Sequence, residues 1–142
     1  SRSGRSLELQ LIKIFDEEGL HRDKSYSYNR VSEGNKKPDF LFPSHDAYQD
    51  SSYVDTNLRM LAVKTTCKDR WRQVLNEADR VPEKHLLTLQ EGVSVNQFSE
   101  MKKAKIKLVV PKNNIKKFPK AIRSELIDVE TFLAGVKTLP PH

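Results

Sequence analysis

The chain has 142 residues, 31% of them charged, and a net charge of +6 at neutral pH. We expect residues 1–142 to form a single domain, because this length can remove about 68–70% of the unfolded chain's surface from water. No apolar run approaches a membrane span and no signal-peptide pattern opens the chain, so we expect a soluble, cytoplasmic protein without a membrane partner. Cys67 is the only cysteine, which excludes an internal disulfide and a cysteine-based zinc cluster.

The first half of the chain predicts a helix followed by short strands. From Ser6 to about Glu18 apolar residues recur at helical spacing, and Gly19 follows as a stop signal. A short strand is expected at about 26–31, a proline-bounded strand in PDFLFP at 38–43, and a loop or helical turn in SHDAYQD at 44–50. The helix face expected to pack inward consists of Leu7, Leu11, Ile14 and Phe15.

The second half alternates strands with helices. Strands are predicted at 58–65, 84–90 and 105–110. Helices are predicted over Cys67 to Val81, Ser94 to Ala104 and Val129 to Val136. Short apolar strands alternating with helices indicate a sheet covered by helices, which is an α/β or α+β domain.

Lys64 ends the strand predicted at 58–65 and is the first candidate site residue. Side chains alternate along a strand, so Leu58, Met60, Ala62 and Lys64 are expected on one side. A buried lysine needs a partner or a chemical role, because desolvation disfavours its charge. The alternative is a lysine that reaches from the strand end into water.

Two acids are expected near Lys64. Asp39 opens the apolar strand at 38–43, and Glu77 borders the core side of the predicted helix, from which it could lean toward the lysine. Two carboxylates beside a lysine recur in nucleases: the carboxylates hold a divalent metal, and the lysine positions water and offsets negative charge. Hard oxygen ligands favour Mg²⁺ over zinc. The alternative for Glu77 is an exposed ion-pair or hydrogen-bond partner of a neighbouring side chain.

A basic segment covers residues 101–123, which contain nine lysines and arginines and no acid. Such a segment suits a polyanion, since each phosphate that is neutralised releases counterions. The alternative is a solvated lysine-rich face. The lysines singled out for contacts with a DNA backbone are Lys102, Lys103, Lys116 and Lys117.

Four segments, PDFLFPS, VKTTCKDRWRQVLNE, LTLQEGVSVNQFSEM and LVVP, resemble the catalytic C-terminal domain of EcoRII-type restriction endonucleases. The similarity in order and spacing runs from RSGRSLE to the last helix. It implies the PD-(D/E)xK nuclease fold, a mixed sheet flanked by helices. It also implies a type II restriction endonuclease from a prokaryotic restriction-modification system. Such an enzyme is a homodimer that uses Mg²⁺, and no small-molecule cofactor, to cut double-stranded DNA at a short palindrome with CC and GG, such as CCWGG.

The chain departs from the usual motif at Ala62, where the D/E-x-K pattern has an acid two residues before the lysine. In this branch of the family the missing acid comes from the following helix, and Glu77 matches it by position. The resemblance thus implies metal binding by Asp39 and Glu77, with the carbonyl of Val63 as a further ligand and Lys64 assisting the water. Glu8 matches an auxiliary metal or water ligand, although an acid near a helix start also has a purely structural explanation.

The triplet Lys68, Asp69 and Arg70 matches the residues with which family members recognise CC/GG pairs. Arginine and lysine donate to the O6 and N7 atoms of guanine, and aspartate accepts from the amino group of cytosine. The alternatives are a helix-capping role for Asp69 and phosphate contacts for the two basic residues, which would give affinity without specificity.

Two other functions stay open. One is a structure-directed or repair nuclease of the same fold, and the other is a catalytically silent DNA-binding module. The abrupt start at SRSGRSLE also leads us to expect that the chain is a fragment lacking an upstream effector or regulatory domain.

Overall fold

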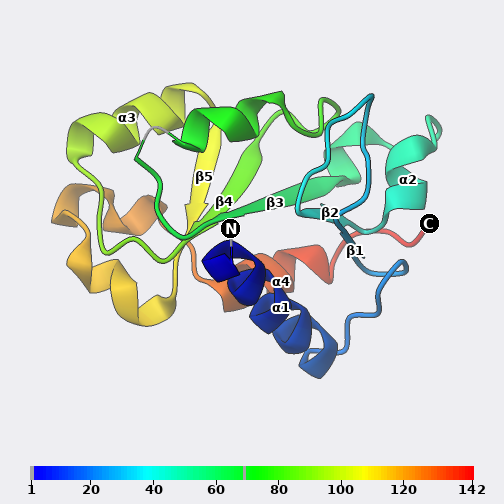
Figure 1. Ribbon diagram of the computed structural model, residues 1–142, viewed down its shortest axis with the longest axis horizontal. Helices are drawn as coiled ribbons and strands as arrows, with labels where there is room; N and C mark the ends of the chain where they lie inside the picture. Colours follow the sequence, from blue (N-terminus) through cyan, green and yellow to red (C-terminus); the bar gives the residue numbers. More distant parts are fainter. Residues whose placement is uncertain (1, 69) are drawn as a thin grey trace.

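The computed structural model describes residues 2–68 and 70–142 and contains a five-stranded mixed sheet (Figure 1). The strands lie in chain order across the sheet. The first three pair antiparallel, and the third, fourth and fifth pair parallel. The expected mixed sheet is therefore confirmed. The strands are β1 Ser27–Tyr28, β2 Phe40–Phe42, β3 Arg59–Lys64, β4 Lys84–Thr88 and β5 Ile106–Val109.

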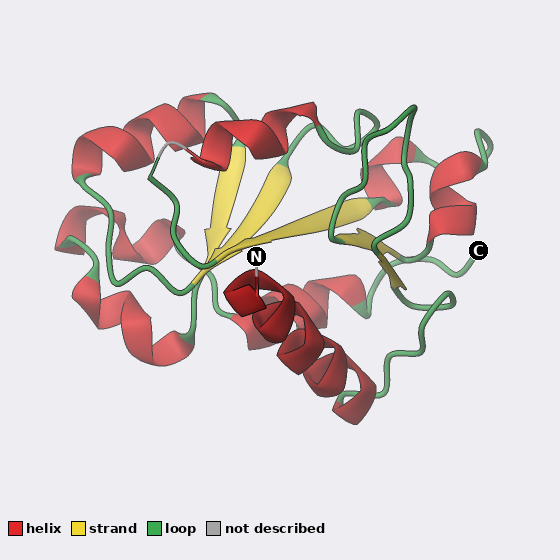
Figure 2. Ribbon diagram, viewed as in Figure 1, coloured by secondary structure: helices red, strands yellow, loops and turns green. Residues whose placement is uncertain are grey.

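Helices cover both faces of the sheet, which makes three layers (Figure 2). One face packs against α1 (Arg2–Glu17) and α4 (Val129–Val136). The opposite face packs against α2 (His45–Gln49), the 3₁₀ helix η2 (Arg70–Asn76), α3 (Val95–Lys103), and the 3₁₀ helices η3 (Lys112–Lys117) and η4 (Lys120–Glu125). The short 3₁₀ helix η1 (Asp55–Asn57) precedes β3.

None of the described helices is both long and apolar enough to cross a membrane.

β3 runs through the middle of the core, because its side chains are buried on both faces. Met60 and Ala62 pack in the layer of η2 and α3, and Leu61 and Val63 pack in the layer of α1 and α4. The alternation of side chains along a strand places Lys64 on the side of Ala62, as expected. The last residue of this strand thus lies where the buried strand meets the polar segment that follows it.

The helix predicted over Cys67 to Val81 is wrong in type and length. The structure has only the 3₁₀ helix η2, and the chain after it takes an irregular course in which Ala78 adopts a left-handed conformation with φ of 50°. The apolar spacing that suggested a long helix comes from two parts of the chain. Trp71 and Val74 are buried in η2, and Ala78 is buried in the irregular chain that follows it. Ile14 was also wrongly expected to pack inward, since 39% of it is exposed.

Candidate functional site

Asp39 lies immediately before β2, at the point where this strand and β3 separate. Its Oδ2 accepts a hydrogen bond of 2.8 Å from the backbone N–H of Val63. Its own backbone carbonyl accepts a bond of 2.8 Å from the N–H of Asn29. If the pairing of β2 and β3 continued, the N–H of Val63 would donate to a backbone carbonyl of the neighbouring strand. Here the Asp39 carboxylate accepts that hydrogen bond instead. This contact fixes the carboxylate against the C-terminal end of β3.

Glu8, Lys64 and Glu77 all lie within electrostatic reach of Asp39. Burial raises the pKa of Asp39 from 3.8 to about 6, against the lowering effect of the Val63 hydrogen bond. The charge of Glu8 and a hydrogen bond with it raise this pKa further, whereas Lys64 lowers it. The structure therefore brings together the four side chains expected at the site, from α1, the start of β2, the end of β3 and the segment after η2.

Glu77 lies one residue beyond η2 and is half-buried, with its Oε2 buried and without a hydrogen-bond partner among the described residues. Burial and the negative charge of Asp39 raise the pKa of Glu77 from 4.5 to about 7, opposed by Lys64 and Lys84. The alternative of an exposed Glu77 paired with a neighbouring side chain is wrong. Arg80, one such neighbour, instead bonds Asp55 at 2.7 Å.

The carboxylates of Asp39 and Glu77 have the properties of a cation site. They repel each other, they are withdrawn from water, and one oxygen lacks a donor. A divalent cation with oxygen preference would relieve all three costs, and Mg²⁺ needs only one or two protein carboxylates because it keeps several waters. Over residues 2–68 and 70–142 the structure contains no cluster of three or more histidine, cysteine or acidic side chains able to hold a metal. These two carboxylates could supply oxygen ligands to such a cation.

Tyr28 is a neighbour of the site that the sequence did not suggest. It ends β1 and pairs with Phe40 across the strands. Its ring lies 5.3 Å from that of Phe40, and the Arg22 guanidinium lies 5.3 Å over its centroid. Burial and the nearby Glu8 charge raise the pKa of Tyr28. The tyrosine thus lies near Glu8 at the edge of the sheet, through a pairing that spacing along the chain does not reveal.

The segment expected to read DNA bases follows β3. Lys68 and Arg70 are exposed, whereas Asp69 lies outside the described residues. Lys68 has a left-handed backbone, with φ of 34°, and its carbonyl accepts a bond of 2.9 Å from Nε2 of Gln97. Oε1 of Gln90 accepts a bond of 2.7 Å from the N–H of Cys67. Gln97 and Gln90 therefore hold Lys68 and Cys67 in place.

The basic segment at 101–123 is divided between paired and unpaired lysines. Lys102 forms an ion pair with Glu125, and Lys117 forms one of 2.6 Å with Glu91. Lys103 and Lys116 have no ion-pair partner in the part of the chain that the structure describes, and Lys103 is exposed. The acids that partner this segment come from outside it, so the run of charge in the sequence overstates the charge that is free in the fold.

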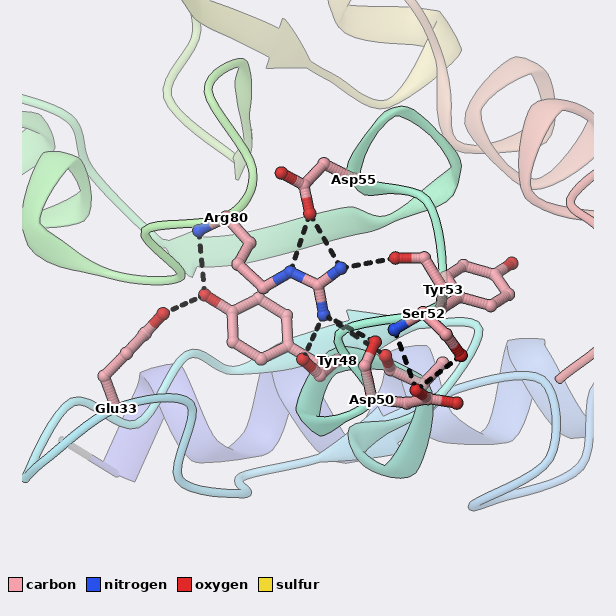
Figure 3. A network of polar contacts seen from close by, with 8 residues as sticks. Glu33, Tyr48, Asp50, Ser52, Tyr53, Asp55 and Arg80 are labelled. Atoms are coloured by element: carbon pink, nitrogen blue, oxygen red, sulfur yellow. Dashed lines mark hydrogen bonds and ion pairs between the residues drawn. The ribbon is translucent and has the colours of Figure 1, made fainter.

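A second polar network, centred on Arg80, holds the chain just beyond Glu77 (Figure 3). The guanidinium donates to the carboxylate of Asp55 and to backbone carbonyls of the chain after β2. The backbone N–H of Arg80 donates to the Tyr48 hydroxyl at 2.9 Å, and that hydroxyl donates to Glu33. Tyr48 is therefore a packed structural residue. The carbonyls that accept from the guanidinium belong to Ala47, Tyr48, Asp50 and Tyr53.

The chain is similar to known proteins over most of its length. The family described as EcoRII C terminal matches residues 1–133. The type II restriction enzyme EcoRII of Escherichia coli is 55% identical over 139 residues, which are 98% of this chain and 34% of that protein. The chain thus spans about one third of the length of this relative.

Two solved structures of Ecl18kI share the fold. They are metal-depleted complexes with uncleaved DNA and with uncleaved, modified DNA, with TM-scores of 0.76 and 0.77. In both, 20% identity extends over 97% of this chain and 45% of that chain. Together with the family match and the identity to EcoRII, this establishes that the chain belongs to the EcoRII C-terminal family.

Proposed function

We propose that this chain is the catalytic domain of a type II restriction endonuclease, which hydrolyses both strands of a short palindromic DNA site with Mg²⁺. The observation that carries the proposal is the half-buried carboxylate pair of Asp39 and Glu77 beside Lys64, with one Glu77 oxygen lacking a partner. The 55% identity to a type II restriction enzyme supports the reaction, and the DNA bound in the Ecl18kI structures supports the substrate.

The metal would be held by Asp39, Glu77 and the carbonyl of Val63. The N–H and carbonyl of one strand residue point to the same edge, and the N–H of Val63 already meets Asp39, so its carbonyl faces that edge too. Bound there, Mg²⁺ would polarise the scissile phosphate and favour ionisation of the attacking water. Lys64 would position that water and offset the charge that develops on the phosphate. Glu8, on the opposite side of β3, would serve as an auxiliary ligand or hold a water.

Sequence recognition would fall to Lys68, Asp69 and Arg70 in the major groove, at a site where CC and GG flank a central pair, as in CCWGG. Two symmetric cuts in a palindrome require two active sites, so we infer a homodimer. If Arg70 contacts guanine, Arg70→Ala should cost about 1–3 kcal/mol of discrimination at one base pair. Competition binding against sites altered one pair at a time tests this, because an arginine on phosphate would weaken binding to every site equally.

The lysines of the basic segment would contact the phosphates that flank the recognition site. Lys103 and Lys116 are the strongest candidates, because no described acid neutralises them, whereas Lys102 and Lys117 are already paired. Each phosphate contact steepens the dependence of binding on salt concentration. Charge reversal at Lys103 and Lys116 should therefore flatten this dependence more than the same change at Lys102 and Lys117.

Digestion of a plasmid that carries CCWGG-type sites tests the proposed reaction. The chain should cut the plasmid into discrete fragments in Mg²⁺, and Lys64→Ala should lose cleavage while DNA binding persists. Cleavage at branched or mismatched DNA without discrete fragments would instead indicate a structure-directed nuclease. Binding without any cleavage by the unaltered chain would indicate a silent DNA-binding module. The control is Lys24→Ala, which changes an exposed lysine between α1 and β1, outside both the basic segment and the proposed active site.

A further inference from the structure

Lys84 is the most deeply buried side chain with a full charge in the part of the chain described here, with only 5% of it exposed. It is the first residue of β4, and its side chain lies in the layer of η2. Burial lowers the pKa of Lys84. An ammonium group in this position costs free energy unless its donors are used, so its hydrogen bonds indicate its role.

The Lys84 ammonium donates to two backbone carbonyls, those of Ala78, at 2.7 Å, and Val81. These carbonyls belong to the irregular segment that immediately follows Glu77. Ala78 is fully buried, and its left-handed backbone, with φ of 50°, costs about 1–2 kcal/mol in a residue with a Cβ. The turn has one local bond, of 2.9 Å from the N–H of Val81 to the carbonyl of Ala78, and the buried ammonium of Lys84 adds a second donor to that carbonyl.

The charge of Lys84 also acts on Glu77 without occupying its carboxylate. Lys84 faces three acids, of which Asp79 is paired with Lys36 at 3.0 Å, and Glu33 accepts from Tyr48 through Oε2 while its buried Oε1 has no partner among the described residues. The third is Glu77, whose buried Oε2 has no donor among the described residues. A lysine bonded directly to this oxygen would compete with a cation, whereas a lysine bonded to the adjacent backbone leaves it open.

We propose that Lys84 is a positioning residue: by bonding the carbonyls of Ala78 and Val81, it sets the Glu77 carboxylate opposite Asp39 and so determines the affinity of this pair for a divalent cation. The inference rests on the proposed function, since it assumes that the pair binds metal. The chain needs such a device because Glu77 comes from an irregular segment, and no regular helix fixes its direction.

Direct titration of the full chain with Mn²⁺, with free ion followed by electron paramagnetic resonance, tests the proposal without DNA or turnover. Lys84→Met keeps the length of the side chain and removes its donors, so the dissociation constant for Mn²⁺ should rise about 10–100-fold. Lys84→Gln keeps one donor and should lie between. Val136→Ala lowers stability in the other layer and should bind Mn²⁺ as the unaltered chain does. Circular dichroism shows which variants are folded. If Lys84→Met does not fold, Lys84→Gln is the variant that tests the proposal.

A double-mutant cycle separates positioning from a general structural effect. In a Glu77→Gln background the site is already impaired, so Lys84→Met or Lys84→Gln should cause no further loss of Mn²⁺ affinity. Unchanged Mn²⁺ binding in a folded Lys84 variant would overturn the proposal, as would an equal loss in both backgrounds. If Glu77→Gln itself leaves Mn²⁺ binding unchanged, the proposed metal site fails, and that result is distinct from a failure of Lys84 alone.

Discussion

Two polar regions lie on either side of the segment after η2, and they differ in how their charges are satisfied. Around Arg80, the guanidinium meets the Asp55 carboxylate and a series of backbone carbonyls (Figure 3). Around Asp39 and Glu77, two carboxylates face each other, and a buried oxygen has no donor. Each region has one buried carboxylate oxygen without a partner among the described residues, Oε1 of Glu33 in the first and Oε2 of Glu77 in the second. The regions differ in that the first pairs a guanidinium with a carboxylate, whereas the second places two carboxylates near each other.

The difference lies in how the charges are combined, opposite charges in the first region and like charges in the second. Buried polar groups are usually hydrogen-bonded, so an unsatisfied one needs an explanation in each case. Both regions contain acids, a tyrosine and a cation, and composition alone does not distinguish them. Burial raises the pKa of Tyr48 in the first region as well, but only in the second does the charge of one carboxylate raise the pKa of another, and a bound cation would reduce that repulsion.

Glu77→Ala should have the largest effect of any change in this comparison. It should reduce cleavage at least about 100-fold, because one of the two carboxylate ligands of the metal is lost. Stability in the absence of metal should rise or stay unchanged, because the variant removes a buried charge that repels Asp39. Cleavage kinetics and urea unfolding on the same preparation measure the two effects. Near-normal cleavage would remove Glu77 from the site.

Arg80→Leu should show the opposite pattern. It should lower the free energy of unfolding by about 2–4 kcal/mol, because several carbonyls lose their donor at once. Cleavage per folded molecule should fall much less than in Glu77→Ala. Urea unfolding and cleavage rates at low temperature provide the measurement. A full loss of cleavage in a folded variant would show that the two regions are not separable.

The pH dependence of stability sharpens the comparison with a smaller effect. The folded-state pKa values of Asp39 and Glu77, about 6 and about 7, lie above their ordinary values of 3.8 and 4.5. The stability that these groups contribute is full below about pH 4 and is lost as the pH rises through 6–7. We expect a loss of about 1–3 kcal/mol in total, since the groups are only partly buried and partly screened.

Urea unfolding between pH 4 and 8, without metal, measures this loss by comparison with the Asp39→Asn/Glu77→Gln variant. The variant is the necessary reference because His85 acts in the opposite direction. Burial lowers the pKa of His85 to about 4, so its contribution to stability grows as the pH rises from 4 to 6.5. Identical pH slopes in both proteins would show that the two carboxylates are not under strain.

The sequence predicted β2 to β5 well, because each contains a short apolar run bounded by prolines or charges. β2 and β3 lie inside their predicted ranges, and α4 has the predicted bounds. The 3₁₀ helices η3 and η4 were not predicted, since each begins after a proline in a segment whose strongest signal was charge. In this segment the run of charged residues did not indicate the secondary structure.

The site was predicted in its members but not in its geometry. Asp39, Lys64 and Glu77 were suggested by residue type, order and resemblance to a family, and the structure brings them together. The sequence did not predict the course of the chain around Glu77. That course involves hydrogen bonds from Lys84 to the carbonyl of Ala78 and from the N–H of Arg80 to the hydroxyl of Tyr48. Contacts of this kind leave no periodic trace in a sequence.

A crystal structure of the chain soaked in Mn²⁺, with an anomalous difference map, tests the central claim most directly. One strong peak is expected within ligand distance of the carboxylates of Asp39 and Glu77 and the carbonyl of Val63, and no such peak is expected in Glu77→Gln. Manganese bound elsewhere while these carboxylates remain empty at saturating concentration would contradict it.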